Sequence, residues 1–181
     1  PEVTAMAGVA QPPEFHPEGD VWVHTLIMLK LLKNLTPELA FASLLHDIGK
    51  PKTFMVTDRI RFNHHPELGA KMAAKICERF RLSNDQEKLI TELIRDHLKF
   101  MNVKKMREAT LKRFLRQPHF EDHLEMHRLD CLASHGQLDC YEFCLKTIGE
   151  LGQEKLSPPK LITGHDLISL GLEPGPLFSK I

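Results

Sequence analysis

The sequence predicts an all-α domain with one short β hairpin. Hydrophobic residues make up 42% of the 181 positions and aromatic residues only 7%, so the core must consist mainly of Leu, Ile, Met and Ala, a mixture that favours helices. Apolar residues recur with helical spacing over most of the chain. Only residues 53–62 carry β-branched residues in a pattern that favours a hairpin or an extended loop. The length suits one domain with a proper core.

Start and stop signals define the expected helices in order. The first covers about residues 20–35, because Asp20 is a suitable N-cap and apolar positions follow His24 at helical spacing. The second covers residues 37–48 and stops at Gly49. Further helices are predicted over residues 66–81, 84–98, 107–117, 119–134 and 139–151, with a short one over residues 164–170.

The two ends of the chain differ from its middle. Residues 1–19 contain four prolines and no long period, which predicts an irregular lead-in. Residues 152–162 are typical of a linker. We therefore expect one domain over residues 1–151, followed by a linker and the start of a C-terminal segment over residues 152–181. The start at Pro and the abrupt Pro/Gly-rich end indicate a piece of a longer protein.

Charge, cysteine usage and hydropathy exclude several classes of protein. The formal net charge is zero, so the chain lacks the basic field typical of a whole domain that binds nucleic acid. Its four cysteines form no C-x-x-C motif, which favours reduced thiols. No apolar run reaches membrane-spanning length and no signal peptide is visible. These features predict a cytoplasmic protein without a membrane segment.

The pair His46-Asp47, within LLHDIGKP (44–51), carries the strongest chemical signal among eleven histidines. It lies at the end of an apolar helix, where a buried charged Asp needs compensation that a metal ion can supply. The partial negative charge at a helix C-terminus also favours a cation. Imidazole nitrogen and carboxylate oxygen together suit hard or borderline divalent metals.

Three further residues of metal-binding type lie on apolar helical faces: His24, His97 and Asp130. Each histidine taken singly is more often an ordinary core or surface residue. Taken together, such residues on four different helices are hard to explain by packing, because a buried Asp without a partner is costly. A helical bundle can bring them to one central site.

Five blocks of the chain resemble a known family. The blocks are HPEGDVWVHT (16–25), LLHDIGKP (44–51), RFNHHPELGA (61–70), RLDCLASHG (128–136) and PPKLITGHDLISLGLEPGP (158–176). The order of His24, His46-Asp47 and Asp130 resembles the HD superfamily of metal-dependent phosphohydrolases. The blocks together resemble the HD region of bacterial CCA-adding enzymes and related poly(A) polymerases. The resemblance covers nearly the whole chain and implies an HD-domain helical bundle.

The resemblance also implies a divalent metal site with one or two ions of Mn, Fe, Ni, Co, Zn or Mg. The first ion would be held by His24, His46, Asp47 and Asp130. Asp47 would bridge to a second ion, held by His65 and His97. Asp47 and Lys50 would be the catalytic residues, with Lys50 stabilising developing negative charge. A solvated lysine that complements the helix dipole is the alternative interpretation of Lys50.

The remaining histidines receive weaker assignments. His65 is preferred to its neighbour His64 because HPELGA matches the family block. His123 and His127 lie seven and three residues before Asp130, so one of them can substitute as a ligand, but positions outside the coordination sphere or on the surface are favoured. Four other histidines are interpreted as ordinary side chains: His16, His119, His135 and His165. Of these, His16 and His135 lie in family-like blocks and can line a pocket.

Residues 99–116 form a basic run of seven Lys and Arg residues against one acidic residue, Glu108. Such a run can follow a phosphate backbone, and a solvated helix face is the alternative. The candidate RNA-binding residues are Lys99, Lys104, Lys105, Arg107, Lys112 and Arg113.

The implied function is metal-dependent hydrolysis of phosphate esters, with nucleotides, 2′,3′-cyclic phosphates or tRNA ends as substrates. The nucleotidyl-transferring head of the family uses carboxylates spaced D-x-D, and no two aspartates here are two apart. The chain alone is therefore not expected to add nucleotides, and the head is expected upstream of Pro1. One alternative is a non-catalytic tRNA-binding module. Another is a free-standing nucleotide phosphohydrolase, against which residues 158–176 argue. The oligomeric state stays open.

Overall fold

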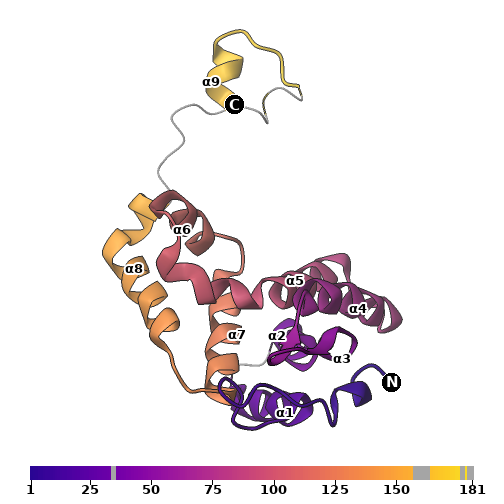
Figure 1. The fold of residues 1–181 in the computed structure, drawn as a ribbon. Coiled ribbons are helices and arrows are strands. Elements are labelled where there is room, and N and C mark those ends of the chain that lie inside the picture. Colours follow the sequence, from indigo (N-terminus) through magenta and orange to yellow (C-terminus); the bar gives the residue numbers. More distant parts are fainter. Residues whose placement is uncertain (34–35, 157–163, 176–177, 179–181) are drawn as a thin grey trace.

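The computed structural model describes residues 1–33, 36–156, 164–175 and 178, and shows the predicted helical fold with one hairpin (Figure 1). The helices are α1 (Val21–Leu31), α2 (Pro37–Leu45), α3 (Lys50–Thr53), α4 (His65–Arg79), α5 (Asn84–Asp96), α6 (Glu108–Leu115), α7 (Phe120–Ala133), α8 (Asp139–Leu156) and α9 (Gly164–Ser169). Two 3₁₀ helices are η1 (Thr4–Met6) and η2 (His97–Lys105). In this described part, no helix is both long and apolar enough to cross a membrane.

The predicted start of α1 is confirmed. The Asp20 carboxylate accepts hydrogen bonds from the backbone N–H groups of Trp22 and Val23, which have no partner within the helix. At α5, Ser83 and Gln86 form a reciprocal capping box. Local sequence therefore sets these helix starts.

The prediction that the second helix reaches residue 48 is wrong. α2 ends at Leu45, because the N–H of Ile48 bonds to the carbonyl of Leu45 three residues earlier and tightens the chain into a turn. The helix predicted over residues 84–98 likewise ends at Asp96, and the chain continues as η2. Both changes occur beside residues that were proposed as metal ligands.

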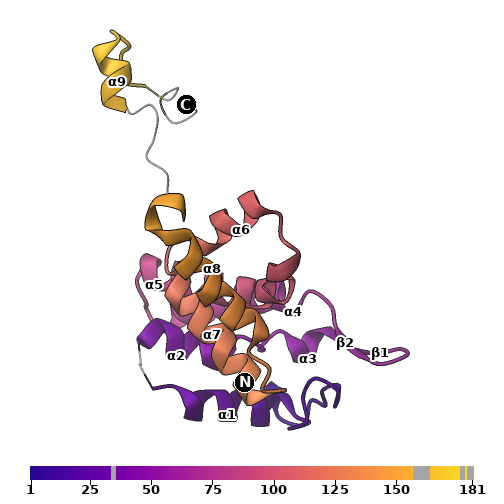
Figure 2. The same ribbon diagram turned by 90° about the vertical axis from the view of Figure 1, so that its left-hand side faces the viewer.

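The hairpin consists of β1 (Phe54–Val56) and β2 (Ile60–Phe62), paired antiparallel with Phe54 opposite Phe62. It projects from the helical body beyond α3 (Figure 2). Its turn is held by the Arg61 guanidinium, which donates to both carboxylate oxygens of Asp58 at 2.7 and 2.9 Å. The sequence prediction of a hairpin in residues 53–62 is confirmed.

Two hydrophobic cores meet on α7, which runs through the middle of the body in Figure 1. The larger core is built from α1, α2, α4, α5 and one side of α7, including Met126 and Leu129. The smaller core combines η2, α6 and α8 with Phe120 and Leu124 of α7. Burial of these apolar side chains is the main force that fixes α7 against both halves.

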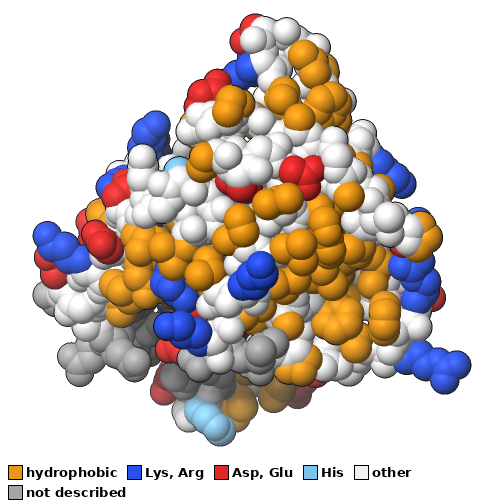
Figure 3. All heavy atoms as spheres, turned by 90° about the horizontal axis from the view of Figure 1, so that it is seen from below, with side chains coloured by type: hydrophobic (Ala, Val, Ile, Leu, Met, Phe, Trp, Pro, Cys, Tyr) orange, Lys and Arg blue, Asp and Glu red, His pale blue; other side chains and the backbone are white. Residues whose placement is uncertain are grey.

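Helix α1 is hydrophobic on more than its core side. Val21 and Met28 are fully buried, whereas Val23 and Leu26 stay more than a third exposed. Hydrophobic side chains gather on the face of the molecule where α1 lies (Figure 3).

At the C-terminal side, α8 departs from helical geometry at Gly152, next to the predicted end at residue 151. Residues 157–163 of the predicted linker and tail lie outside the described residues. The division into a domain over 1–151 and a segment over 152–181 stays a prediction.

Candidate metal centre

The six predicted ligands come from five parts of the fold and meet in its interior. His24 projects from α1 and Asp130 from α7, while His46 and Asp47 lie in the turn after α2. His65 and His97 are the first residues of α4 and η2. The histidines and Asp47 are at most 6% exposed.

Three of these histidines share one local device. Each imidazole places Nδ1 against the backbone carbonyl of the residue three positions earlier, and a carbonyl can only accept, so Nδ1 carries the proton. The pairs are His46 with Ser43 at 2.9 Å, His65 with Phe62 at 2.9 Å and His97 with Ile94 at 2.7 Å. The lone pair on Nε2 is therefore available to a metal ion.

Asp47 lies at the centre of this arrangement. Its Oδ2 is 3.2 Å from His46 Nε2, and its Oδ1 is 3.4 Å from His65 Nε2. Two triads of possible ligands share it, His24 with His46 and His65 with His97, each with all ligand atoms within 4.8 Å of one another. Ligand atoms bonded to one ion at ~2.1 Å lie roughly 3–4 Å apart, so this spacing suits a shared ion.

His24 is held between two carboxylates. Its Nε2 is 3.0 Å from Asp130 Oδ1, and its Nδ1 is 2.6 Å from Glu18 Oε1. Burial lowers the pKa of His24, but Asp130 and Glu18 outweigh burial and raise it to about 10. A metal ion bound at Nε2 would displace the proton, and Glu18 would keep the ring oriented through Nδ1.

The buried polar atoms fit a divalent cation. Among the described residues, both nitrogens of His24, Nε2 of His46 and of His65, and both carboxylate oxygens of Asp47 have no hydrogen-bond partner of acceptable geometry. Unpaired buried polar groups are costly, and their close contacts at angles unsuited to hydrogen bonds are typical of atoms that share an ion. Nitrogen and oxygen donors of this kind suit borderline divalent metals, as the HD resemblance implies.

The charge states support the same interpretation. Burial, followed by the nearby His46 and His65, lowers the pKa of His97 to about 3, so this imidazole is neutral and can act as a ligand. Burial raises the pKa of the Asp47 carboxyl, but His46 and Lys50 outweigh burial and hold that pKa well below its usual range. Asp47 is therefore ionised.

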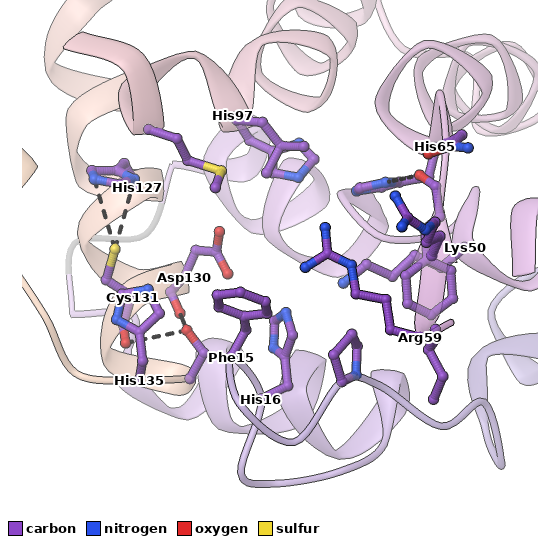
Figure 4. A pocket seen from close by; sticks show the side chains of 18 residues that line it. Phe15, His16, Lys50, Arg59, His65, His97, His127, Asp130, Cys131 and His135 are labelled. Atoms are coloured by element: carbon purple, nitrogen blue, oxygen red, sulfur yellow. Dashed lines mark hydrogen bonds between the residues drawn. The ribbon is translucent and has the colours of Figure 1, made fainter. Parts of the chain in front are cut away.

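Three of the six candidate ligands, His65, His97 and Asp130, line a cavity of about 530 Å³. Figure 4 shows Asp130, His127, Cys131 and His135 on one side of it, Lys50, Arg59 and His65 on the other, and Phe15 and His16 between them. The cavity gives a small molecule direct access to these three residues.

Lys50 is buried beside the site, so the alternative interpretation as a solvated helix-end lysine is wrong. Its Nζ lies 2.7 Å from Asp47 Oδ2 and donates to Gln11 Oε1 at 2.6 Å. The same ammonium lies 5.3 Å from the centre of the Phe62 ring. Lys50 therefore neutralises part of the charge of Asp47.

The other histidines separate clearly by position. His64 is exposed while His65 faces the site. His127 lines the cavity and stacks on Phe100, with ring centroids 4.6 Å apart and an angle of 7° between the planes. His123 is buried as well, so the surface positions considered for these two residues are wrong.

Sequence reasoning missed three residues at the site: Gln11, Glu18 and Arg59. Gln11 and Glu18 belong to the lead-in, where no periodicity marks a buried side chain. Glu18 also contacts His16, with 2.9 Å between Oε1 and Nδ1. Arg59 reaches from the hairpin turn into the cavity (Figure 4). A Glu and a His within the block HPEGDVWVHT were the only available signal for Glu18.

The basic run is partly neutralised by ion pairs. Lys99 pairs with Asp96 at 2.7 Å, Lys104 with Asp139 at 2.6 Å and Lys112 with Glu108 at 2.6 Å. Three further candidates for RNA contact stay exposed at the surface: Lys105, Arg107 and Arg113.

Comparison with known proteins agrees with this geometry. The HD domain family model matches residues 21–134. The multifunctional CCA protein of Acinetobacter baumannii strain AYE is 35% identical over 119 residues, which are 65% of this chain and 29% of that protein. The one from Legionella pneumophila strain Paris is 34% identical over 119 residues, with the same coverage. The aligned region thus spans under a third of these relatives. On the family match and the predicted HD motif together, this chain belongs to the HD domain family.

Proposed function

We propose that this chain is a metal-dependent phosphohydrolase that acts on phosphate esters of nucleotides, including 2′,3′-cyclic phosphates, or of tRNA ends. The observation that carries the proposal is the convergence on Asp47 of imidazole nitrogens from several helices, at the edge of a cavity. Buried imidazole nitrogens and carboxylate oxygens that point together without hydrogen bonds of acceptable geometry have no evident use in packing.

A divalent ion held by His24, His46, Asp47 and Asp130, with a second held by Asp47, His65 and His97, would activate a water molecule and polarise the phosphoryl group. The protein's own residues prepare the site for this chemistry. Glu18 orients His24, and the carbonyl contacts at Nδ1 orient the other three histidines.

Two cations serve the phosphate itself. The Lys50 ammonium lies beside Asp47, and the Arg59 guanidinium reaches into the cavity from the hairpin. Negative charge that develops on a phosphoryl group is stabilised by such positioned cations. A guanidinium can also bind two phosphate oxygens at once.

The name of the relatives and the resemblance to CCA-adding enzymes direct the choice of substrate. A protein concerned with CCA sequences would meet nucleotides and tRNA ends, so phosphate groups on these molecules are the proposed targets. The reaction class itself rests on the candidate metal centre.

The substitution Asp47→Asn tests the proposal, since it removes the shared negative charge and keeps the side-chain shape. We expect a loss of bound metal, measured by elemental analysis, and a fall of more than ~100-fold in hydrolysis of bis-p-nitrophenyl phosphate. Asp85→Asn, at an exposed position in α5, is the matched control and should change neither. Unchanged metal content together with unchanged hydrolysis in Asp47→Asn would refute the assignment.

A non-catalytic tRNA-binding module is the second candidate, favoured by the exposed side chains of Lys105, Arg107 and Arg113. Under this alternative the protein retains metal but turns over no phosphoester. Its tRNA affinity should fall steeply with salt and weaken after reversal of charge at Lys105 and Arg113. A flat salt response would exclude it.

A further inference from the structure

The cavity beside the candidate metal centre has a lining of two chemical kinds. Its lining includes three candidate ligands, His65, His97 and Asp130, and the cations Lys50 and Arg59. It also includes large apolar side chains, among them Phe15 and Met101. A second cavity of about 300 Å³ shares five of these lining residues: Phe15, Met101, His127, Cys131 and His135. The lining therefore suits a ligand with an anionic part and a flat, weakly polar part.

Phe15 and Met101 are unusually accessible for large apolar side chains, with exposed fractions of 48% and 65%. They come from segments far apart in the sequence, the lead-in and η2, yet line the same two cavities. Exposed apolar area is unfavourable in water, and a phenyl ring and a thioether both bind flat aromatic rings well. Their shared position at the cavity edge indicates a contact surface for a ligand ring.

Groups able to hydrogen-bond surround this apolar surface. The Nδ1 atom of His135 accepts a hydrogen bond from the N–H of Gln137 at 3.0 Å, so Nε2 of His135 carries the proton and can donate. His135 and Gln137 both line the smaller cavity. A ring with acceptors and donors at its edge, such as a nucleobase, matches this combination of stacking surface and polar rim.

We propose that Phe15 and Met101 form the nucleobase subsite of this protein, so that a nucleoside phosphate lies with its phosphate at the metal centre and its base against Phe15. The inference rests on the proposed function, because it takes the phosphate position from that function. It makes the protein selective for phosphates attached to a nucleoside over phosphates of simple alcohols. The nucleoside can belong to a free nucleotide or to the end of an RNA, since both present the same base.

Equilibrium binding tests the subsite without any turnover. Calorimetry compares the phosphonate analogue of adenosine 2′-monophosphate with that of glycerol 2-phosphate, which lacks the base; the C–P bond of both analogues resists hydrolysis, so neither ligand turns over. We expect the wild type to bind the nucleotide at least ~10-fold more tightly, as one base stack implies. Phe15→Leu should remove most of this difference, whereas Phe15→Trp should keep it, because stacking needs an aromatic face. Phe80→Leu, at a side chain 63% exposed on the far end of α4, is the matched control.

Kinetics provide the second measurement. In Phe15→Leu, kcat/KM for adenosine 2′,3′-cyclic phosphate should fall ~10-fold more than kcat/KM for glycerol 1,2-cyclic phosphate. A short oligoribonucleotide with the same cyclic end separates the two sources, since tighter binding than the mononucleotide identifies an RNA end.

The outcomes separate the two proposals. Equal binding of nucleotide and glycerol phosphate by the wild type overturns the base subsite, even if both cyclic phosphates are hydrolysed. Base-dependent binding that Phe15→Leu abolishes supports the subsite even if no substrate is hydrolysed, and in that case only the proposed function fails. An equal loss of both ligands in Phe15→Leu also overturns the subsite, because it indicates damage to the whole cavity.

Discussion

Gly49 separates His46-Asp47 from α3, and its replacement by Ala should damage the site by steric force alone. Its backbone angles, φ −79° and ψ −22°, are ordinary for Ala. An added Cβ, however, would lie 2.3 Å from the carbonyl oxygen of His65 and 2.9 Å from the nitrogen of Gly69, both backbone atoms of α4. Since ordinary contact begins at about 3.4 Å, α4 must move by about 1 Å.

This displacement acts directly on the candidate metal centre, because His65 begins α4 and its Nε2 lies 3.4 Å from Asp47 Oδ1. We expect Gly49→Ala to lower the free energy of unfolding by about 1–3 kcal/mol, typical of overpacking. A shift of ~1 Å in catalytic geometry costs ~100-fold in rate, so hydrolysis of bis-p-nitrophenyl phosphate should fall by about that factor. Bound metal per chain should fall as well.

Urea unfolding, elemental analysis and the hydrolysis assay on the same preparations measure the three effects. Gly149→Ala in α8 is the matched control, because an added Cβ there meets no atom within 4 Å. It should stabilise the protein by up to ~1 kcal/mol through helix propensity. If Gly49→Ala kept the wild-type unfolding midpoint, metal content and activity, the close approach of α4 to this turn would be wrong.

Three further predictions follow from buried or capping side chains. Glu18→Gln should weaken metal binding about 10–100-fold in a chelator competition, because the Gln amide holds the His24 imidazole less firmly than a carboxylate does. Unaltered metal affinity would show that Glu18 does not orient His24. Burial lowers the pKa of His123 to about 4, so between about pH 6.5 and pH 4 the unfolded chain binds a proton that the folded chain does not. Stability should therefore fall as pH drops through this window, by up to about 3 kcal/mol, and His123→Gln should lessen the fall; identical pH profiles would contradict this. Ser83→Ala should cost about 1 kcal/mol of unfolding free energy by removing the capping box of α5, with metal content unchanged, and a loss of metal would show that the cap affects the site.

Local signals in the sequence predicted much of the fold. Asp20 caps α1 as expected, and residues 53–62 form the expected hairpin, because both depend on neighbouring residues. The ligand set came from unusual residues on apolar faces together with the family resemblance. Five of those side chains lie together around Asp47, and the sixth, Asp130, contacts His24, although their binding of metal stays a prediction.

Features that depend on tertiary packing were not predictable. The sequence predicts Gly49 only as a helix stop, whereas in the structure its main significance is the close approach of α4. Glu18 lies in a segment without periodicity, and only the folded chain places its carboxylate beside Nδ1 of His24. Lys104 and Asp139 are 35 positions apart and form an ion pair, which lowers the net positive charge at the basic run. No local sequence pattern reveals this pair.

The position of α7 in both hydrophobic cores has a consequence for the opening motions of the protein. Asp130 lies on this helix, so an ion that binds there opposes separation of α7 from α1 and from the helices around η2. Amide hydrogen exchange should then slow on metal addition in α6 and α8, which contribute no candidate ligand. Cooperative protection of these outlying helices would show that the two halves of the body open as one unit.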